Sequence, residues 1–308
     1  MNRQMLIGVG CGVLAGALWG LVFLAPNLTP DFSPLEISAA RYLAYGVMAS
    51  ALIAPRWRTL RPKLKRDDWR ALVWLSLAGN IVYYVFLASA VQLSGPAPAA
   101  LIVGLLPVVI SLIGSREEDA VSARRLAPSL ILAVLGVALI SLESLAGAQG
   151  SWQSQALGLV CAAGGLACWA AFAVGNARRI AKLPNVSSHD WSLLLGVVTG
   201  AQALVMTPAF ALSLGEHDSH DWLGLVLISS AIALLASVAG NALWNSASRR
   251  LPLTMTGQIV IFETLFALLY ACIWEQRLPT LLEVGAIAAL GTAVLWCVSS
   301  HRMPRPHE

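Results

Sequence analysis

The sequence predicts an all-α integral membrane protein with ten transmembrane helices arranged as a 5+5 inverted repeat, and three observations support it. Hydrophobic residues make up 57% of the 308 residues and charged residues only 12%, whereas a soluble domain is about 45–50% apolar and about 25% charged. The apolar residues gather in runs long enough to cross the hydrocarbon core of a bilayer, which takes roughly 20 residues of helix. The runs are continuous, without the alternation of a β-barrel.

Ten apolar runs define the expected helices in chain order. The first is preceded by one charge, Arg3, and lacks a convincing small-residue cleavage site, so we expect a retained helix rather than a signal peptide. The fourth and fifth runs are short, which leaves nine helices as the nearest alternative count. The expected spans are approximately 5–25, 37–54, 71–93, 97–114, 126–142, 156–177, 191–214, 222–248, 253–274 and 282–300.

The basic residues predict the orientation. Apart from Arg41 and Arg277, every Lys and Arg lies at the N-terminus, in an even-numbered connection or in the C-terminal tail. The positive-inside rule makes that side cytoplasmic and places both termini there. The net charge is a modest +4, and the basic residues lie between apolar runs rather than on one face, so we do not expect nucleic-acid binding.

Cysteines and histidines predict no metal site. The five cysteines fall inside apolar runs and are expected to be small buried hydrophobes: Cys11, Cys161, Cys168, Cys272 and Cys297. The histidines lie outside the spans. His217 and His220 share an acidic external loop with Glu216, Asp218 and Asp221, and we expect that loop to be solvated. No Walker A or zinc-protease motif is present, so nothing requires a cofactor or indicates ATP hydrolysis.

The two halves of the chain resemble each other weakly. Four short matches recur in the same order: 17–20 with 167–170, Gly79-Asn80 with Gly240-Asn241, Gly95-Pro96 with Leu251-Pro252, and 133–136 with 288–291. With five helices per half, the second half must enter the membrane from the opposite side. The sequence therefore predicts repeats at 1–150 and 151–308 within one membrane domain, an architecture typical of secondary transporters with a solute site near the midplane.

Three features resemble a known family. Ala17-Leu18-Trp19-Gly20 lies in the first span, an arginine is embedded in the second (37–42, Ile-Ser-Ala-Ala-Arg-Tyr), and acids end the fourth and ninth (Glu117 or Glu118, and Glu275). Over its whole length the chain resembles the drug/metabolite transporter (DMT) superfamily, EamA type, and within it looks most like the YddG type of aromatic amino-acid exporter. The resemblance implies export of neutral, mainly aromatic, amino acids across the bacterial inner membrane.

Two helix faces combine amides with aromatic rings. Asn80, Tyr83 and Tyr84 share one face of the third span, at i, i+3 and i+4. The eighth span repeats the pattern with Asn241, Trp244 and Asn245. Rings that stack on a planar side chain, beside amides that bind a carboxylate or amine, suit an amino acid. The alternative is helix packing with the amides bonded across the bundle.

Trp19 and Trp169 occupy matching positions within their spans and are expected to line a central cavity. Trp69, Trp191 and Trp222 lie at span ends, where an interfacial position is expected.

Two charged residues lie inside spans. Glu263 is near the centre of the ninth, where an acid costs roughly 2.5–3.5 kcal/mol on insertion scales and should face the bundle interior. We expect it, with Gln258, to attract a substrate amine or to titrate during the cycle; a neutral structural acid is the alternative. Arg41 either snorkels outward or forms an external gate or carboxylate contact.

Backbone features indicate close packing and one bend. Gly8, Gly12, Gly16 and Gly20 form a stripe that suits close helix approach. Gly104 and Pro107 in the fourth span predict either a hinge or a static kink.

These observations predict a secondary transporter that exports a small amphipathic solute, such as a neutral or aromatic amino acid, by alternating access. Its only expected partners are that small molecule and the lipid bilayer, and no oligomer is predicted. Rival functions are export of drugs or other metabolites, a membrane-embedded enzyme, for which clustered His, Asp or Glu at an interface is missing, and a channel, for which a polar ring is missing. Proton coupling stays open.

Overall fold

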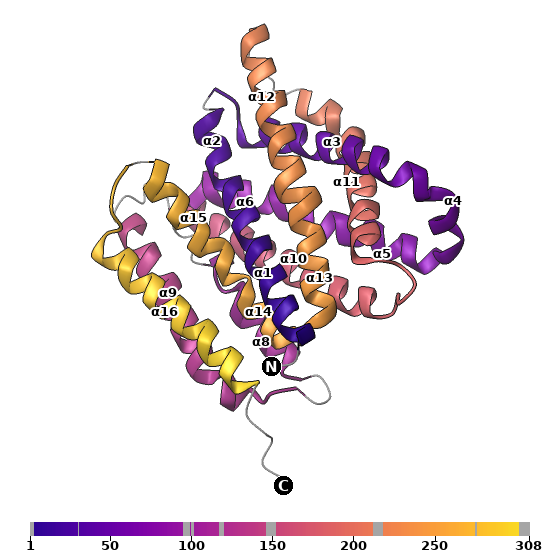
Figure 1. Cartoon of the computed structure of the whole chain (residues 1–308). Coiled ribbons are helices and arrows are strands. Elements are labelled where there is room, and N and C mark those ends of the chain that lie inside the picture. Colours follow the sequence, from indigo (N-terminus) through magenta and orange to yellow (C-terminus); the bar gives the residue numbers. More distant parts are fainter. Residues whose placement is uncertain are drawn as a thin grey trace.

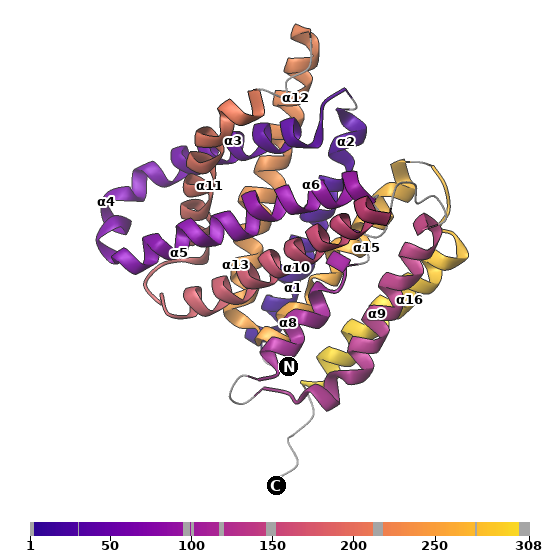
Figure 2. The same cartoon turned by 180° about the vertical axis from the view of Figure 1, so that it is seen from behind.

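The computed structural model describes residues 3–29, 31–94, 99, 102–116, 120–145, 152–211, 218–274 and 276–301. Within these ranges the secondary structure is helical throughout and contains no strand. Figures 1 and 2 show a bundle of long, mutually inclined helices. The sequence prediction of an all-α fold is confirmed for the described residues.

The first half of the chain begins with α1 (Arg3–Gly20), which continues through the 3₁₀ turn η1 (Leu21–Leu24) and the short α2 (Ala25–Leu28). A capping box formed by Ser33 and Glu36 starts α3. The remaining elements are α3 (Pro34–Ile53), η2 (Ala54–Arg56), α4 (Trp57–Leu60), η3 (Arg61–Lys63), α5 (Arg66–Ser76), the π-helical η4 (Leu77–Ile81), α6 (Val82–Ser94), α8 (Leu106–Gly114) and α9 (Ala123–Leu145).

The second half contains a similar series. A second π-helical segment interrupts one of its long helices, and capping boxes start α12 and α16. The elements are α10 (Trp152–Ala181), α11 (Ser188–Ala211), α12 (Ser219–Ile232), the π-helical η5 (Ala233–Gly240), α13 (Asn241–Arg250), α14 (Leu253–Ile259), α15 (Ile261–Trp274) and α16 (Leu281–Ser300).

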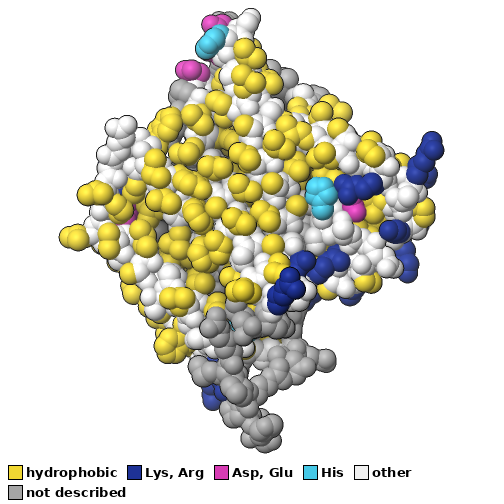
Figure 3. All heavy atoms as spheres, in the orientation of Figure 1, with side chains coloured by type: hydrophobic (Ala, Val, Ile, Leu, Met, Phe, Trp, Pro, Cys, Tyr) yellow, Lys and Arg dark blue, Asp and Glu magenta, His cyan; other side chains and the backbone are white. Residues whose placement is uncertain are grey.

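Seven stretches among the described residues are long and apolar enough to cross a membrane. They are Leu35–Lys63, Arg66–Val91, Trp152–Ala181, Ser188–Thr207, Ser219–Arg250, Leu253–Trp274 and Leu281–Ser300. The other three predicted spans correspond to α1, α8 and α9, which are helical but not among these seven. Hydrophobic side chains cover much of the visible face (Figure 3), and large ones such as Val205 at 80% exposure point outward. Such a surface suits lipid.

Helices from the two halves pack against each other in pairs. The most extensive contacts join α9 with α16, α3 with α11, and α6 with α10, followed by α8 with α14 and by α1 with α13 and α15. The α9–α16 pair lies at one edge of the bundle in both Figure 1 and Figure 2. Each listed pair combines one helix from residues 1–150 with one from 151–308, so the interface between the halves runs through the whole bundle.

Glycines permit two of these close approaches. A Cβ added at Gly46 of α3 would lie 2.6 Å from the Cα of Gly200 on α11, so the two backbones touch where these helices cross. The predicted stripe on α1 is a packing surface: an added Cβ at Gly12 would collide with Ile259, and one at Gly16 would lie 2.8 Å from Phe262. The stripe therefore packs α1 onto α14 and α15.

Candidate functional site

Three tryptophans meet in the centre of the bundle. The ring centroids of Trp19 and Trp169 are 6.2 Å apart, edge to face, and Trp244 lies 5.2 Å from Trp19 and 5.9 Å from Trp169. All three side chains are buried. The indole N–H of Trp19 donates to the carbonyl of Ala236 at 3.1 Å. The structure thus brings the predicted pair together and adds Trp244 to it.

The two π-helical segments make room for aromatic rings from the opposite half. Gly79 lies in η4, and a Cβ there would be 2.5 Å from the ring of Phe172 on α10. Gly240 ends η5, and a Cβ there would be 2.9 Å from the indole nitrogen of Trp19. Single π-helical turns inside α-helices are frequent at functional sites. Here each one admits a ring and turns the asparagine that follows its glycine toward a neighbouring helix.

A second group of predicted residues surrounds Tyr83. Its side chain lies within electrostatic range of the carboxyl of Glu263, the guanidinium of Arg41 and the phenol of Tyr84. These residues come from three helices, α3, α6 and α15, and all are half-buried. They form what we call the Tyr83 group: Arg41, Tyr83, Tyr84 and Glu263. It is the only predicted combination here that places opposite charges near aromatic rings.

Arg41 is held by a neutral partner. Its Nε donates to the hydroxyl of Ser237 in η5 at 3.2 Å, and its guanidinium carbon lies 5.3 Å from the ring centroid of Tyr42. Within the described residues neither Arg41 nor Glu263 forms an ion pair. Among the described residues, the guanidinium of Arg41 and the carboxyl of Glu263 are therefore charged groups inside the predicted spans that no salt bridge neutralises.

The two repeat-matched asparagines have different partners. Asn80 donates to the hydroxyl of Thr199 on α11 at 3.1 Å. Asn241 donates to the hydroxyl of Tyr45 at 3.4 Å, and Tyr45 in turn donates to the carbonyl of Ser192 at 2.7 Å. Both asparagines are half-buried, so each keeps part of its amide accessible. The alternative expectation, that these amides form hydrogen bonds across the bundle, holds for one side-chain nitrogen of each asparagine.

Asn245 belongs to a buried network nearer the basic end of α13. It accepts from the amide of Asn176 at 2.6 Å, and Asn176 accepts from the indole of Trp191 at 2.8 Å. Trp191 is completely buried by protein and packs inside the bundle. A span-end position in the sequence does not distinguish a helix face toward lipid from one toward protein. Asn176 and Trp191 are the residues here that sequence reasoning undervalued.

Gln258 also lies apart from the Tyr83 group. It is 1% exposed and donates to the hydroxyl of Ser111 on α8 at 3.2 Å, and Ser111 donates to the carbonyl of Thr254 at 3.1 Å. This network joins α8 and α14.

The predicted bend at Gly104 and Pro107 lies at the start of α8. Residues 102–103 are helical, Gly104 and Leu105 form a turn, and α8 begins at Leu106 with Pro107 in its first turn. The predicted bend is thus a break between two helical pieces.

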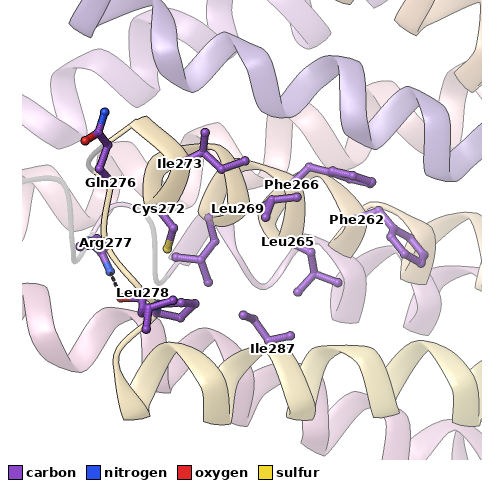
Figure 4. Close-up of a pocket in the computed structure, with 12 residues that line it drawn as sticks. Phe262, Leu265, Phe266, Leu269, Cys272, Ile273, Gln276, Arg277, Leu278 and Ile287 are labelled. Atoms are coloured by element: carbon purple, nitrogen blue, oxygen red, sulfur yellow. Dashed lines mark hydrogen bonds between the residues drawn. The ribbon is translucent and has the colours of Figure 1, made fainter.

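Two cavities lie beside α15, away from these residues. An apolar groove of about 630 Å³ separates α15 from α16, with Phe262, Leu265 and Leu269 on one side and Ile287 on the other (Figure 4). A smaller cavity of about 330 Å³ adjoins Tyr270 and Trp274. No predicted site residue lines either one. Arg277 at the rim donates to both carboxyl oxygens of Glu283, at 2.6 and 2.8 Å.

The histidine–aspartate cluster at the start of α12 caps that helix. Asp218, His220 and Asp221 offer ligand atoms within 4.8 Å of one another and are exposed or half-buried. Asp218 accepts the backbone N–H groups of His220 and Asp221, each at 2.8 Å. Its bond to the Asp221 N–H lowers the pKa of Asp218 below the usual 3.8, with that to His220 contributing. Glu117, Glu118, Glu216, His217, Glu275 and the Gly95-Pro96 pair lie outside the described residues.

Comparison with known proteins identifies the family. Residues 6–142 match the EamA-like transporter family. The chain is 33% identical to the inner membrane protein YtfF of Escherichia coli (strain K12) over 96% of this chain and 95% of that protein. It is 28% identical to the aromatic amino acid exporter YddG of Ancylobacter novellus, over 64% of this chain and 67% of that one.

Two further comparisons cover nearly the whole chain. The uncharacterized transporter YdeK of Bacillus subtilis (strain 168) is 27% identical over 88% of both chains. A solved crystal structure superposes with a TM-score of 0.77 at 19% identity, covering 96% of this chain and 98% of that one, and supports the fold. The identity to YtfF over almost the full length of both proteins, together with the family match, shows that this membrane protein belongs to the EamA-like transporter family of the DMT superfamily.

Proposed function

We propose that the chain is a secondary transporter that exports small amphipathic solutes, specifically neutral and aromatic amino acids, across the bacterial inner membrane. It does so by alternating access between two five-helix repeats, 1–150 and 151–308, of opposite orientation, with both termini cytoplasmic. The curated relative named as an aromatic amino acid exporter, at 28% identity, supports the substrate class. Among the visible side chains, Lys and Arg gather over the α4–α5 end and the end of α13 (Figure 3), in keeping with the proposed inner face.

Matching local features support the repeat. The π-helical segments η4 and η5 contain the sequence-matched Gly79 and Gly240, and each glycine faces an aromatic ring from the opposite half. Gly46 and Gly200 meet on helices that hold the same place in the two halves. An arrangement in which each half supplies the same device to the other favours two-fold-related units that move against each other.

The observation that carries the substrate assignment is the unpaired charge of the Tyr83 group. Arg41 belongs to the first half and Glu263 to the second, and both lie within electrostatic range of Tyr83. Charges inside a membrane are costly and usually functional. An amino acid zwitterion satisfies both, its carboxylate accepting from Arg41 and its ammonium donating to Glu263. Its side chain then lies against the aromatic rings of the Tyr83 group and the tryptophan cluster.

Reconstitution tests this function. Purified protein in liposomes is loaded with labelled phenylalanine, methionine or threonine, and flux is followed with and without a pH gradient. We expect saturable phenylalanine flux that excess tryptophan inhibits. Flux of cationic drugs without any amino acid flux would replace this proposal by drug export, and dependence on the pH gradient would assign proton coupling.

Two variants test the site. Arg41→Gln and Glu263→Gln each remove one charge while keeping polar volume, and we expect each to reduce flux at least about tenfold, the equivalent of roughly 1.4 kcal/mol. Glu283→Gln is the control, because this acid lies in an ion pair away from the Tyr83 group. If Glu263→Gln changes neither the rate nor its pH profile, Glu263 has only a structural role.

A further inference from the structure

The inner ends of the two halves are joined by a buried ion pair that the site above does not use. Asp68 is the third residue of α5 and is 2% exposed. One of its carboxyl oxygens accepts from Arg179 at the end of α10 at 2.5 Å, and the other accepts the backbone N–H of Lys65 at 2.7 Å. The Arg179 side chain is 25% exposed. The pair connects residues 1–150 with residues 151–308.

Two further contacts join the same segments. Arg56 and Asp190 form an ion pair of 3.0 Å, with side-chain exposures of 45% and 16%. Lys63 donates to the carbonyl of Asn185 at 3.3 Å. All three contacts run from residues 56–68, which end in the first turn of α5, to residues 179–190, which extend from the last turn of α10 to the first turn of α11. We call the two ion pairs, Asp68–Arg179 and Arg56–Asp190, the inner latch.

The inner latch closes a stack of layers along α10. Trp169 belongs to the tryptophan cluster, Asn176 to the buried amide network, and Arg179 to the latch. At a rise of 1.5 Å per residue, Asn176 lies about 10 Å and Arg179 about 15 Å along α10 from Trp169. The layers are therefore successive barriers between the tryptophan cluster and the inner ends of the helices.

We propose that the inner latch is the cytoplasmic gate of the transport cycle. Asp68 and Arg179 are paired while the inner side is closed, and they separate when α5 and α10 part to admit solute from the cytoplasm. This inference rests on the proposed function, because a gate presupposes a solute pathway. It goes beyond that function by naming the residues that set how often the pathway opens inward.

Burial gives the pair its discriminating property. Removing one member of a buried ion pair leaves the other charge unsatisfied, which strongly destabilises the closed contact. When α5 and α10 part, water reaches both groups and hydrates the separated charges. The closed form is therefore stabilised by pairing, while the open form is stabilised by hydration.

Distance measurement tests the gate without any substrate. Spin labels are placed at the exposed positions 66 and 182 of the full chain, after its five native cysteines have been replaced. Double electron–electron resonance in liposomes then reports the separation of α5 from α10. We expect one short distance in the otherwise wild-type protein and a second, longer one in Arg179→Gln, with the open-to-closed ratio raised at least about tenfold.

Matched variants separate gating from simple damage. Arg179→Lys retains the charge and is expected to keep the wild-type distances. Asp68→Asn retains an acceptor for the Lys65 N–H and serves if Arg179→Gln does not fold. Glu283→Gln breaks an ion pair that lies within one half and should leave the inner labels unchanged.

Two results would overturn the gate. One is an unchanged distance distribution in folded Arg179→Gln or Asp68→Asn; the other is an equal change in Glu283→Gln. Failure of the two proposals can be told apart. If the wild-type protein in liposomes transports no amino acid while the latch variants open as expected, the substrate assignment is rejected and the gate is retained. Amino acid flux with unchanged distances rejects the gate alone.

Discussion

The two ends of the bundle are held together by different chemistry. At the end that carries the inner latch, charged side chains from one half pair with charged side chains of the other, as in Asp68–Arg179. At the opposite end, the contact between the first connection and α12 is aromatic: Phe32 and Trp222 pack with ring centroids 5.3 Å apart. The ion pair found there, Arg277–Glu283, joins residues of the second half only.

This difference bears on how each end can open. An ion pair needs a narrow range of distance and direction, so a small displacement breaks it and exposes two charges that must be hydrated. Aromatic surfaces keep much of their contact while they slide, because dispersion and apolar burial are not directional. We infer that the inner end behaves as a two-position contact and the outer end as a graded one.

The largest effect is expected where the helices between the two ends cross. Gly46→Leu places a side chain where an added Cβ already lies 2.6 Å from the backbone of Gly200. We expect loss of the folded protein or a destabilisation above the 1–3 kcal/mol usual for overpacking, because backbone cannot move aside as a side chain can. Thermal unfolding in detergent measures it.

Gly224→Leu is the matched control for Gly46→Leu, because nothing lies within 4 Å of a Cβ at Gly224. Equal melting temperatures for the two variants would show that the close approach of α3 to α11 does not hold the two ends of the bundle in position.

A smaller effect is expected from the exposed member of the inner latch. Arg56→Gln removes an ion pair whose arginine is 45% exposed, and such pairs contribute about 0.2–1 kcal/mol. The open-to-closed ratio between the spin labels should therefore rise less than about fivefold, well below the change for Arg179→Gln. The reverse order would assign the gate to Arg56–Asp190.

Acidification should weaken a contact between the end of α16 and α14. His301 lies just beyond α16, with its Nδ1 2.7 Å from the carbonyl of Cys297 and its Nε2 2.6 Å from the hydroxyl of Thr254. Burial lowers the pKa of His301 below its usual 6.5. Its contribution to stability is full above that value and is lost as the pH falls through the folded-state pKa.

Melting temperatures at pH 7.5 and pH 5 check this expectation. Wild-type protein should lose more on acidification than His301→Gln, which cannot titrate. An identical loss in both would assign the acid sensitivity to other groups.

The smallest effect belongs to the outer end. Asp218 caps α12, and its hydrogen bond from the Asp221 N–H lowers its pKa, so the cap is complete above the ordinary carboxyl pKa and is lost as the pH falls through the depressed one. In Asp218→Ala, amide hydrogen exchange at His220 and Asp221 should become faster while the Tyr83 group and transport are unaffected. Unchanged exchange would show that the turn is held by other contacts.

Helices were the most predictable part of the fold, because a long apolar run has one stable form in lipid. The hydrogen-bond partners of the polar side chains were less predictable. Asn80 and Asn241 match in sequence, yet one bonds Thr199 and the other Tyr45, since the partner depends on the facing helix. Hydropathy placed Trp191 at a span end but contains no information on which of its faces is covered by protein.

The candidate site was only partly predictable for a related reason. Helical spacing placed Tyr83 and Tyr84 on one face, but it could not show that Arg41 and Glu263, more than 200 positions apart, approach the same ring. The inner latch escaped prediction entirely. Asp68 and Arg179 lie in connections rich in charge, and only the fold singles out the pair that is buried.

The π-helical segment η4 has a consequence for sequence change in this protein. It lies between Asp68 on α5 and Tyr83 on α6, and its i→i+5 bonding accommodates an extra residue in the turn. Deleting one residue there would close the wide turn into a regular helix and remove the space that Gly79 leaves for the ring of Phe172. A deletion in this turn thus acts on the packing between the two halves, and indels there should be far rarer among natural variants than substitutions.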